Sequence, residues 1–236
     1  MDHHHLALRR RQVLHGALLL GGAAIIASAS GCGTPAPDQP ANQPADRPAS
    51  APATSRPTAA AGRTVLLVYF SRPGENYHYG GRRNLTIGNT QVLARMIGER
   101  LDCDLHRIQA ADPYPDDYDQ TVARNVQEQD TDARPAITGP LPDLGRYDTV
   151  LLAGPIWNVR APMIMTTFTE KLDLTGKAVH PITTYAMSGL GTTERDYAAS
   201  CPGATIGDGL AVRGEEVSGA GPDIEAWLRR TGLPRR

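Results

Sequence analysis

The sequence predicts an α/β domain in which an open, five-stranded parallel sheet is covered by helices on both faces. Short, continuous apolar runs, typical of strands buried on both faces, begin at Thr64, Tyr147 and Lys177. A segment with apolar residues at helical spacing follows each run. Strands that alternate with helices require right-handed crossovers and a parallel sheet. Ligands of such sheets bind beyond the carboxyl ends of the strands.

Residues 1–32 are expected to be an export signal that does not belong to the fold. A basic head ending at Arg11 precedes an apolar stretch that is short for a bilayer span. The pair Arg10-Arg11 resembles a twin-arginine signal. The residues that end at Cys32, Ala-Ser-Gly-Cys, resemble the lipobox of bacterial lipoproteins, which makes Cys32 the predicted lipid-attachment residue. An ordinary cleaved signal with an incidental cysteine is the alternative.

Residues 33–62 are predicted to be a disordered linker. Pro, Ala, Ser and Thr dominate this stretch, which has almost no large apolar side chains and cannot offset the entropy cost of ordering. It would hold a domain of residues 63–236 away from a membrane surface, although low-complexity filler predicts the same disorder. The formal net charge of −1 for the whole chain argues against nucleic acid as a partner.

The first predicted strand leads through a long loop into a helix. The strand covers 64–70, the loop begins at Ser71, and Gly88-Asn89-Thr90 opens a helix in which apolar residues recur at helical spacing. Asn89 or Thr90 occupies the expected position of the helix cap. A strand that runs through hydroxyl- and glycine-containing residues into a helix gathers backbone N–H groups on a phosphate. We therefore predict a phosphate site here.

The remaining elements follow the same alternation. An edge strand is predicted at 104–108 and a second helix at 121–128. The acidic residues of 112–119 could be read as metal ligands, but capping of the helix start is the favoured interpretation. Further strands are predicted at 147–153, 177–185 and about 204–212, and further helices at 163–172, after 193 and at 222–230.

Three loops each follow a buried strand and should converge at one edge of the sheet. The first loop (71–90) offers hydroxyl and N–H groups, the second (154–162) an indole flanked by prolines, and the third (185–193) an aromatic residue followed by Ser-Gly-x-Gly. An anion site on one side and flat rings on the other describe a pocket for a mononucleotide-like cofactor.

The motifs in these loops resemble the flavodoxin family. They are VYFSRPGENY with a following GNT, then GPIWxxxAP, MSGxG and CPGA, and they occur in order between about 63 and 233. The long insertion after Ser71 is similar to that of the flavodoxin-like subgroup often found as bacterial lipoproteins. The resemblance implies FMN as cofactor at the switch point of a sheet with strand order 2-1-3-4-5, the arrangement for which flavodoxin itself is the standard example.

The resemblance also implies which residues bind FMN. The phosphate loop would supply Ser71, Gly88, Asn89 and Thr90. The first ring-flanking loop would supply Pro155, Trp157 and Asn158, and the second would supply Tyr185, Ser188 and Gly189. No metal ligand is expected. No side chain is expected to act as acid, base or nucleophile, because the three loops contain no cysteine and no histidine other than His78.

One position departs from the subgroup pattern. Asn158-Val159-Arg160 stands where Trp-Gly-Thr is usual, so the flexible glycine beside the flavin is lost and a cation is added. Arg160 could stabilise an anionic reduced ring, attract an acidic substrate, or be a solvated loop arginine.

The histidines and cysteines are given structural interpretations. His106 and His180 lie in predicted strands beside apolar neighbours. Cys103 and Cys201 are expected to be free thiols, because the inferred topology separates them by more than the ~7 Å between Cα atoms that a disulfide tolerates.

Three functions remain open at this point. The first is an FMN protein for electron transfer, or for flavin-dependent reduction of quinones or small acceptors, anchored by lipid at the extracytoplasmic membrane face. The second is an NAD(P)H-dependent FMN oxidoreductase. The third is a binding lipoprotein that keeps the scaffold without the cofactor, since a fold alone does not determine function.

Overall fold

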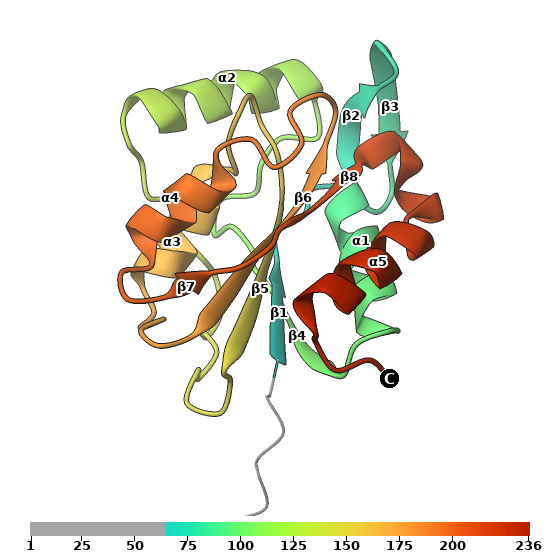
Figure 1. Cartoon of the computed structure of the whole chain (residues 1–236). Helices are drawn as coiled ribbons and strands as arrows, with labels where there is room; N and C mark the ends of the chain where they lie inside the picture. Colours follow the sequence, from blue (N-terminus) through green and yellow to red (C-terminus); the bar gives the residue numbers. More distant parts are fainter. Residues whose placement is uncertain (1–64) are drawn as a thin grey trace, which may run out of the picture. The chain divides into compact units, whose positions relative to one another are not determined.

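The computed structural model describes residues 65–236, and within them the chain forms one parallel sheet and a small hairpin (Figure 1). The strands of the parallel sheet are β1 (Val65–Tyr69), β4 (Cys103–Arg107), β5 (Thr149–Pro155), β6 (Ala178–Tyr185), β7 (Thr205–Ile206) and β8 (Leu210–Arg213). Their order is β4-β1-β5-β6, with β7 and β8 both paired to β6 and every pair parallel. The predicted α/β fold and the order 2-1-3-4-5 are confirmed, except that two short strands share the fifth position.

The fifth position is interrupted at Asp208 for a physical reason. The Asp208 carbonyl oxygen accepts a hydrogen bond from Trp227 Nε1 at 2.9 Å and lies 3.0 Å from His180 Nδ1. A carbonyl can only accept, so Nδ1 of His180 donates. Between β7 and β8, the Asp208 carbonyl is therefore bonded to two side chains and not to a neighbouring strand. The structural interpretation of His180, which is only 8% exposed, is thereby confirmed.

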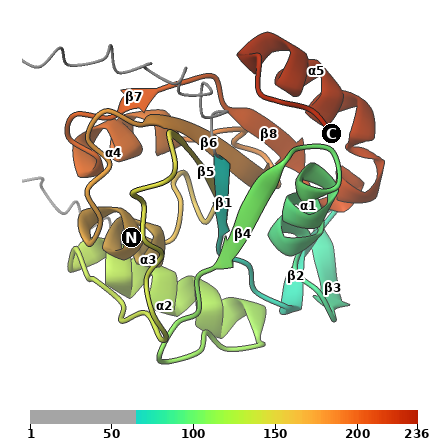
Figure 2. The same ribbon diagram turned by 90° about the horizontal axis from the view of Figure 1, so that it is seen from below.

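Helices cover both faces of the sheet (Figures 1 and 2). One face packs against α1 (Asn89–Gly98) and α5 (Gly221–Thr231), the other against α3 (Met163–Glu170) and α4 (Thr193–Ser200). Alternate residues of β1 enter the two cores: Val65 and Leu67 the first, Leu66 and Val68 the second. This two-sided burial explains why the strand is an uninterrupted apolar run rather than an alternating one.

The first loop contains a hairpin where the sequence suggested only a polar loop. The antiparallel strands are β2 (Gly74–His78) and β3 (Gly81–Leu85). Tyr79 and Gly80 connect them with positive φ angles of 47° and 87°. Positive φ at both central residues is the geometry of a tight two-residue hairpin turn, and Gly80 adopts it without strain.

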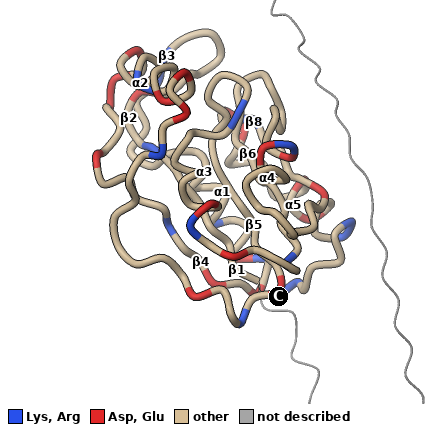
Figure 3. Tube along the Cα trace, turned by 90° about the vertical axis from the view of Figure 1, so that its left-hand side faces the viewer, with Lys and Arg blue, Asp and Glu red and all other residues tan. Residues whose placement is uncertain are grey.

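The remaining helix, α2 (Tyr118–Asp130), lies across the carboxyl-end side of the molecule in Figure 1. The side chain of Asp117 accepts a hydrogen bond from the Gln120 N–H at 2.8 Å, so the capping interpretation of this acidic segment is confirmed. The hairpin is attached to the start of α2. Arg82 lies 3.6 Å over the ring of Tyr118 and 3.2 Å from the carboxylate of Asp119. Figure 3 shows acidic and basic residues side by side on these elements.

The two cysteines of the described region are free, as predicted. Cys103 packs against the core that holds α1 and α5, whereas Cys201 lies in the core on the opposite face of the sheet. The predicted export signal with Cys32 and the linker 33–62 lie outside the described residues.

From Val65 onward, none of the helices has the length and apolar character needed to cross a membrane.

Candidate functional site

A pocket of about 420 Å³ lies at the carboxyl ends of the central strands. All three predicted loops contribute to its wall. The predicted site residues that line it are Ser71, Asn89, Thr90, Pro155, Trp157, Asn158 and Tyr185. The structure thus brings both the phosphate-loop residues and the ring-flanking residues to one cavity.

Gly88, Ser188 and Gly189 lie beside this pocket without lining it. Gly88 is the N-cap residue of α1. Ser188 Oγ donates to the carbonyl of Asn158 at 3.5 Å, and the Gly189 carbonyl accepts from Thr183 Oγ1 at 2.9 Å. These contacts shape the second and third loops, while direct contact of the three residues with a ligand remains a prediction.

Helix α1, which begins at the phosphate end of the pocket, has a different N-cap from the one expected. Neither Asn89 nor Thr90 is the cap, because Gly88 occupies that position and provides no side-chain oxygen. The hydroxyl of Ser71 accepts a hydrogen bond from the Gln91 N–H at 3.1 Å instead. A Cβ on Gly88 would collide with the Ser71 hydroxyl and with the backbone of Arg72, so only glycine permits this close approach.

The first turn of α1 keeps free donors. The N–H groups of Asn89 and Thr90 have no hydrogen-bond acceptor among residues 65–236. The hydroxyl of Thr90 lies 2.7 Å from that of Thr184, and either can donate. If Thr184 donates, the hydroxyl hydrogen of Thr90 is free for a ligand. Free N–H groups at a helix start bind anions well.

Arg72 adds a buried positive charge to the same wall. The side chain donates to the carbonyl oxygens of Pro115 at 2.7 Å, Asp116 at 3.0 Å and Glu75. Burial lowers the pKa of Arg72, and the nearby Asp116 and Glu75 oppose that effect, so the guanidinium stays charged near neutral pH. Its Nε is buried and has no partner within residues 65–236.

At the ring end, Trp157 stands edge-on against two aromatic residues. Its ring centroid lies 5.8 Å from that of Phe70 and 5.0 Å from that of Tyr114. The backbone N–H of Trp157 donates a hydrogen bond to the Arg160 carbonyl at 2.9 Å, which closes a tight turn. Asn158 has φ 66° in this turn, a left-handed conformation that Asn tolerates better than most residues. Asparagine at position 158 therefore allows the turn without a glycine.

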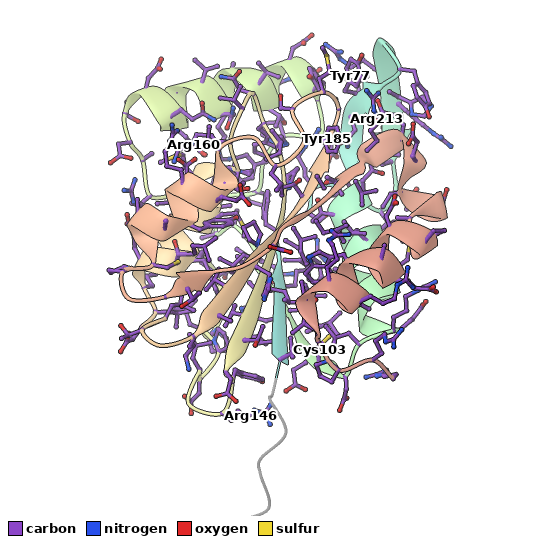
Figure 4. The ribbon with its side chains drawn as sticks, viewed as in Figure 1. Tyr77, Cys103, Arg146, Arg160, Tyr185 and Arg213 are labelled. Carbon is purple, nitrogen blue, oxygen red and sulfur yellow. The ribbon has the colours of Figure 1, made fainter. Side chains whose placement is uncertain are left out.

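Arg160 fits none of the three roles considered from the sequence. It is not in the pocket wall, and its Nε lies 3.4 Å from Asp196 Oδ2 of α4 in a half-buried ion pair. Figure 4 shows Arg160 on the α4 side, away from Tyr185 and Arg213. The positive charge of Arg160 is thus paired with a carboxylate of α4.

Helix α2 supplies one whole wall of the pocket that sequence reasoning missed. The residues are Tyr118, Thr121, Val122, Asn125 and Val126. They recur at spacings of three and four residues and so share one helical face. Val122 and Val126 are 42% and 45% exposed, which is unusual for valines on an otherwise polar helix. In the sequence, the two valines four residues apart on this polar helix were the signal that could have revealed this wall.

The hairpin and the 3₁₀ helix η1 (Gly214–Gly219) complete the pocket with residues that include Tyr77 and Glu215. The Tyr79 N–H donates to Glu215 Oε1 at 3.3 Å, whereas Glu215 Oε2 is buried without a partner in the described region. The pocket wall therefore contains one carboxylate, Glu215, whereas Glu75 of the first loop lies outside the wall. His78 lies outside the wall and packs against Tyr79 at 4.8 Å.

Residues 65–236 contain no group of three or more His, Cys, Asp or Glu residues that could hold a metal ion.

A parallel sheet in this order, with a polar and aromatic pocket at the carboxyl ends of its strands, defines a flavodoxin-like protein. The family model for flavodoxin matches residues 85–230, and the chain belongs to the flavodoxin family.

Solved structures resemble this chain over most of their length. A candidate flavoprotein from Bacteroides eggerthii DSM 20697 is 27% identical with a TM-score of 0.57, over 72% of this chain and 99% of that one. A second, from Bacteroides uniformis ATCC 8492, is 28% identical with a TM-score of 0.56, over 71% and 99%. A Lactobacillus acidophilus NCFM flavoprotein in complex with FMN is 16% identical with a TM-score of 0.49, over 67% and 98%. No match was found among curated proteins.

Proposed function

We propose that this protein binds FMN in the pocket and uses it for electron transfer or for the reduction of small acceptors. One observation carries the proposal. In a chain of the flavodoxin family, a single cavity joins the free N–H groups of Asn89 and Thr90 to the aromatic side chains of Trp157 and Tyr185. A phosphate donor set and flat side chains in one pocket match the two ends of FMN.

Two buried polar atoms that have no partner within residues 65–236 also suit this cofactor. Arg72 Nε is a donor beside Ser71, and a donor with positive charge suits a phosphate. Glu215 Oε2 is an acceptor, and the ribityl hydroxyl groups of FMN are donors. Buried polar groups cost free energy unless they are paired, so a ligand that pairs both groups would be favoured.

FMN supplies the chemistry when bound, by accepting and releasing one or two electrons. The residues of the chain position the ring, exclude water and set the local charge. Trp157 is held by Phe70 and Tyr114, so its indole is a rigid wall. Glu75 and His78 of the first loop do not line the pocket, and Glu215 is the one carboxylate in the described wall.

Quinones or other small acceptors at the extracytoplasmic membrane face are the proposed redox partners. The support is the signal-like segment 1–32 with Arg10-Arg11 and Cys32. A twin-arginine route would export the domain already folded. Changing Cys32→Ser should move the protein from the membrane to the soluble fraction. Continued membrane binding after signal cleavage would contradict the lipid anchor.

The visible absorption spectrum of the purified full-length protein tests the proposal. Flavin bands that persist through gel filtration, with FMN released on denaturation, are expected. A colourless protein that also fails to take up added FMN would favour a scaffold without cofactor. Bleaching of the bands by NADH or NADPH at a catalytic rate would favour the NAD(P)H-dependent oxidoreductase.

A further inference from the structure

Asn125 is a buried polar residue in the α2 wall of the pocket. It is 3% exposed and comes from an element outside the three loops. A side-chain amide has two N–H donors and an acceptor oxygen, and buried polar groups are nearly always hydrogen-bonded. The partners of this amide therefore indicate what the wall presents to a ligand.

Gln129, one turn further along α2, fixes the orientation of the Asn125 amide. Gln129 Nε2 donates to the Trp157 carbonyl at 3.3 Å and to Asn125 Oδ1 at 3.1 Å. The Trp157 carbonyl can only accept, so Gln129 must turn its NH₂ group toward that oxygen. The same NH₂ group then requires the oxygen of Asn125 as its second partner. The NH₂ group of Asn125 consequently points elsewhere.

The NH₂ group of Asn125 reaches the pocket. Among residues 65–236, the buried side-chain atoms without a partner are Arg72 Nε, Arg160 Nε and Glu215 Oε2, and Asn125 Nδ2 is not one of them. Yet no residue of the described part accepts a hydrogen bond from it. The group is therefore accessible, and since the residue is almost fully buried, the pocket is the space it can reach.

We infer that Asn125 donates a hydrogen bond to the flavin ring and favours its reduced form, with Gln129 as the positioning residue. The inference rests on the proposed binding of FMN. Reduction makes the ring more electron-rich, and a fixed N–H donor interacts more strongly with the reduced ring than with the oxidised one. Because Gln129 also binds the Trp157 carbonyl, the donor and the ring-flanking turn are held as one unit.

The test is a redox titration of FMN bound to full-length Asn125→Asp. Aspartate keeps the size of the side chain and the acceptor for Gln129, but it removes the donor and adds a negative charge. We expect the preference for reduced over oxidised FMN to fall about tenfold or more. Tenfold corresponds to a two-electron potential about 30 mV lower. Gln129→Ala, which frees the amide to rotate, should lower the potential by less.

Gln127→Glu is the matched control, because it makes the same change from amide to carboxylate on an exposed position of α2. It should leave the potential unchanged. If Asn125→Asp does not fold, Asn125→Ala removes the donor without a charge and should shift the potential in the same direction. An equal loss of affinity for both redox forms would show a merely structural role and overturn the inference. Failure of the wild type to bind FMN would instead overturn the proposed function.

Discussion

The phosphate end and the ring end of the pocket are built in different ways. The phosphate end comes mainly from the continuous stretch 71–91. In it, the Ser71 hydroxyl accepts a hydrogen bond from the Gln91 N–H and lies close to Gly88. The ring end is assembled from distant segments: Trp157 after β5, Tyr185 at the end of β6 and the pocket face of α2. One end is thus determined mainly by local backbone, the other by tertiary packing.

This difference implies that the two ends should respond differently to substitution. At the phosphate end, backbone N–H groups and a close approach leave little tolerance for an added atom. At the ring end, apolar surface is shared among several side chains, so that losing one removes only part of the contact. Substitutions at the phosphate end should weaken the binding of FMN but not of riboflavin, which lacks the phosphate. Substitutions at the ring end should weaken the binding of both ligands.

The largest effect is expected for Gly88→Ala. The added Cβ would come within 2.8 Å of the Arg72 carbonyl carbon and would push the first loop away from α1. Overpacking of this kind costs about 1–3 kcal/mol, and at the upper end FMN affinity falls about a hundredfold. FMN titration followed by fluorescence measures it. Gly219→Ala is the control, since a Cβ there meets nothing within 4 Å. Near-normal binding by Gly88→Ala would show that the close approach is not needed.

Thr90→Ala separates the two ends most clearly. Loss of one hydrogen bond to a charged phosphate costs about 1.5–3 kcal/mol, so FMN should bind roughly ten- to hundredfold more weakly. Riboflavin should bind wild type and variant alike. Thr184→Ala, which removes the partner hydroxyl of Thr90, should have a smaller effect in the same direction. Equal weakening of FMN and riboflavin by Thr90→Ala would mean that the phosphate site has been misplaced.

Trp157→Leu should affect both ligands by a similar and smaller factor. The indole contributes about 0.5–1.5 kcal/mol beyond area burial, which corresponds to roughly two- to twelvefold in affinity. Flavin fluorescence should rise because the neighbouring indole no longer quenches it, and the reduction potential should shift. Reduction by dithionite should still proceed. A loss confined to FMN would contradict the assignment of Trp157 to the ring end.

The smallest effect is expected for His78→Ala. His78 is outside the wall of the pocket, so turnover with an artificial acceptor should stay within about twofold of wild type. A residue that transfers protons would cost about 10²–10⁴. A hundredfold loss with FMN still bound would point to a catalytic enzyme rather than an electron carrier.

Much of the fold could be predicted because its strands are unambiguous. β1 enters two cores and is apolar throughout, so both its identity and its central place follow from composition. The hairpin β2–β3 was missed because Tyr79-Gly80 is not one of the common dipeptides of a two-residue turn. The split of the fifth strand depends on Trp227 and His180 meeting Asp208, which no local pattern encodes.

The site was predictable where it follows strands. The three loops were expected to converge because each succeeds a buried strand, and the structure places residues from all three in one pocket. Glu215 could have been found by the same rule, since it follows the last strand. Asn125 and the ion pair of Arg160 with Asp196 could not, because the packing of α2 and α4 decides which side chains they meet.

The location of FMN in a crystal structure of the complex tests the central claim most directly. The account predicts one FMN per chain, with the phosphate at the start of α1 beside Ser71 and Arg72 and the ring between Trp157 and Tyr185. It also predicts that the NH₂ group of Asn125 lies within hydrogen-bond distance of a ring oxygen or nitrogen. A flavin bound elsewhere, or in this pocket with the ring at the α1 end, would contradict the account.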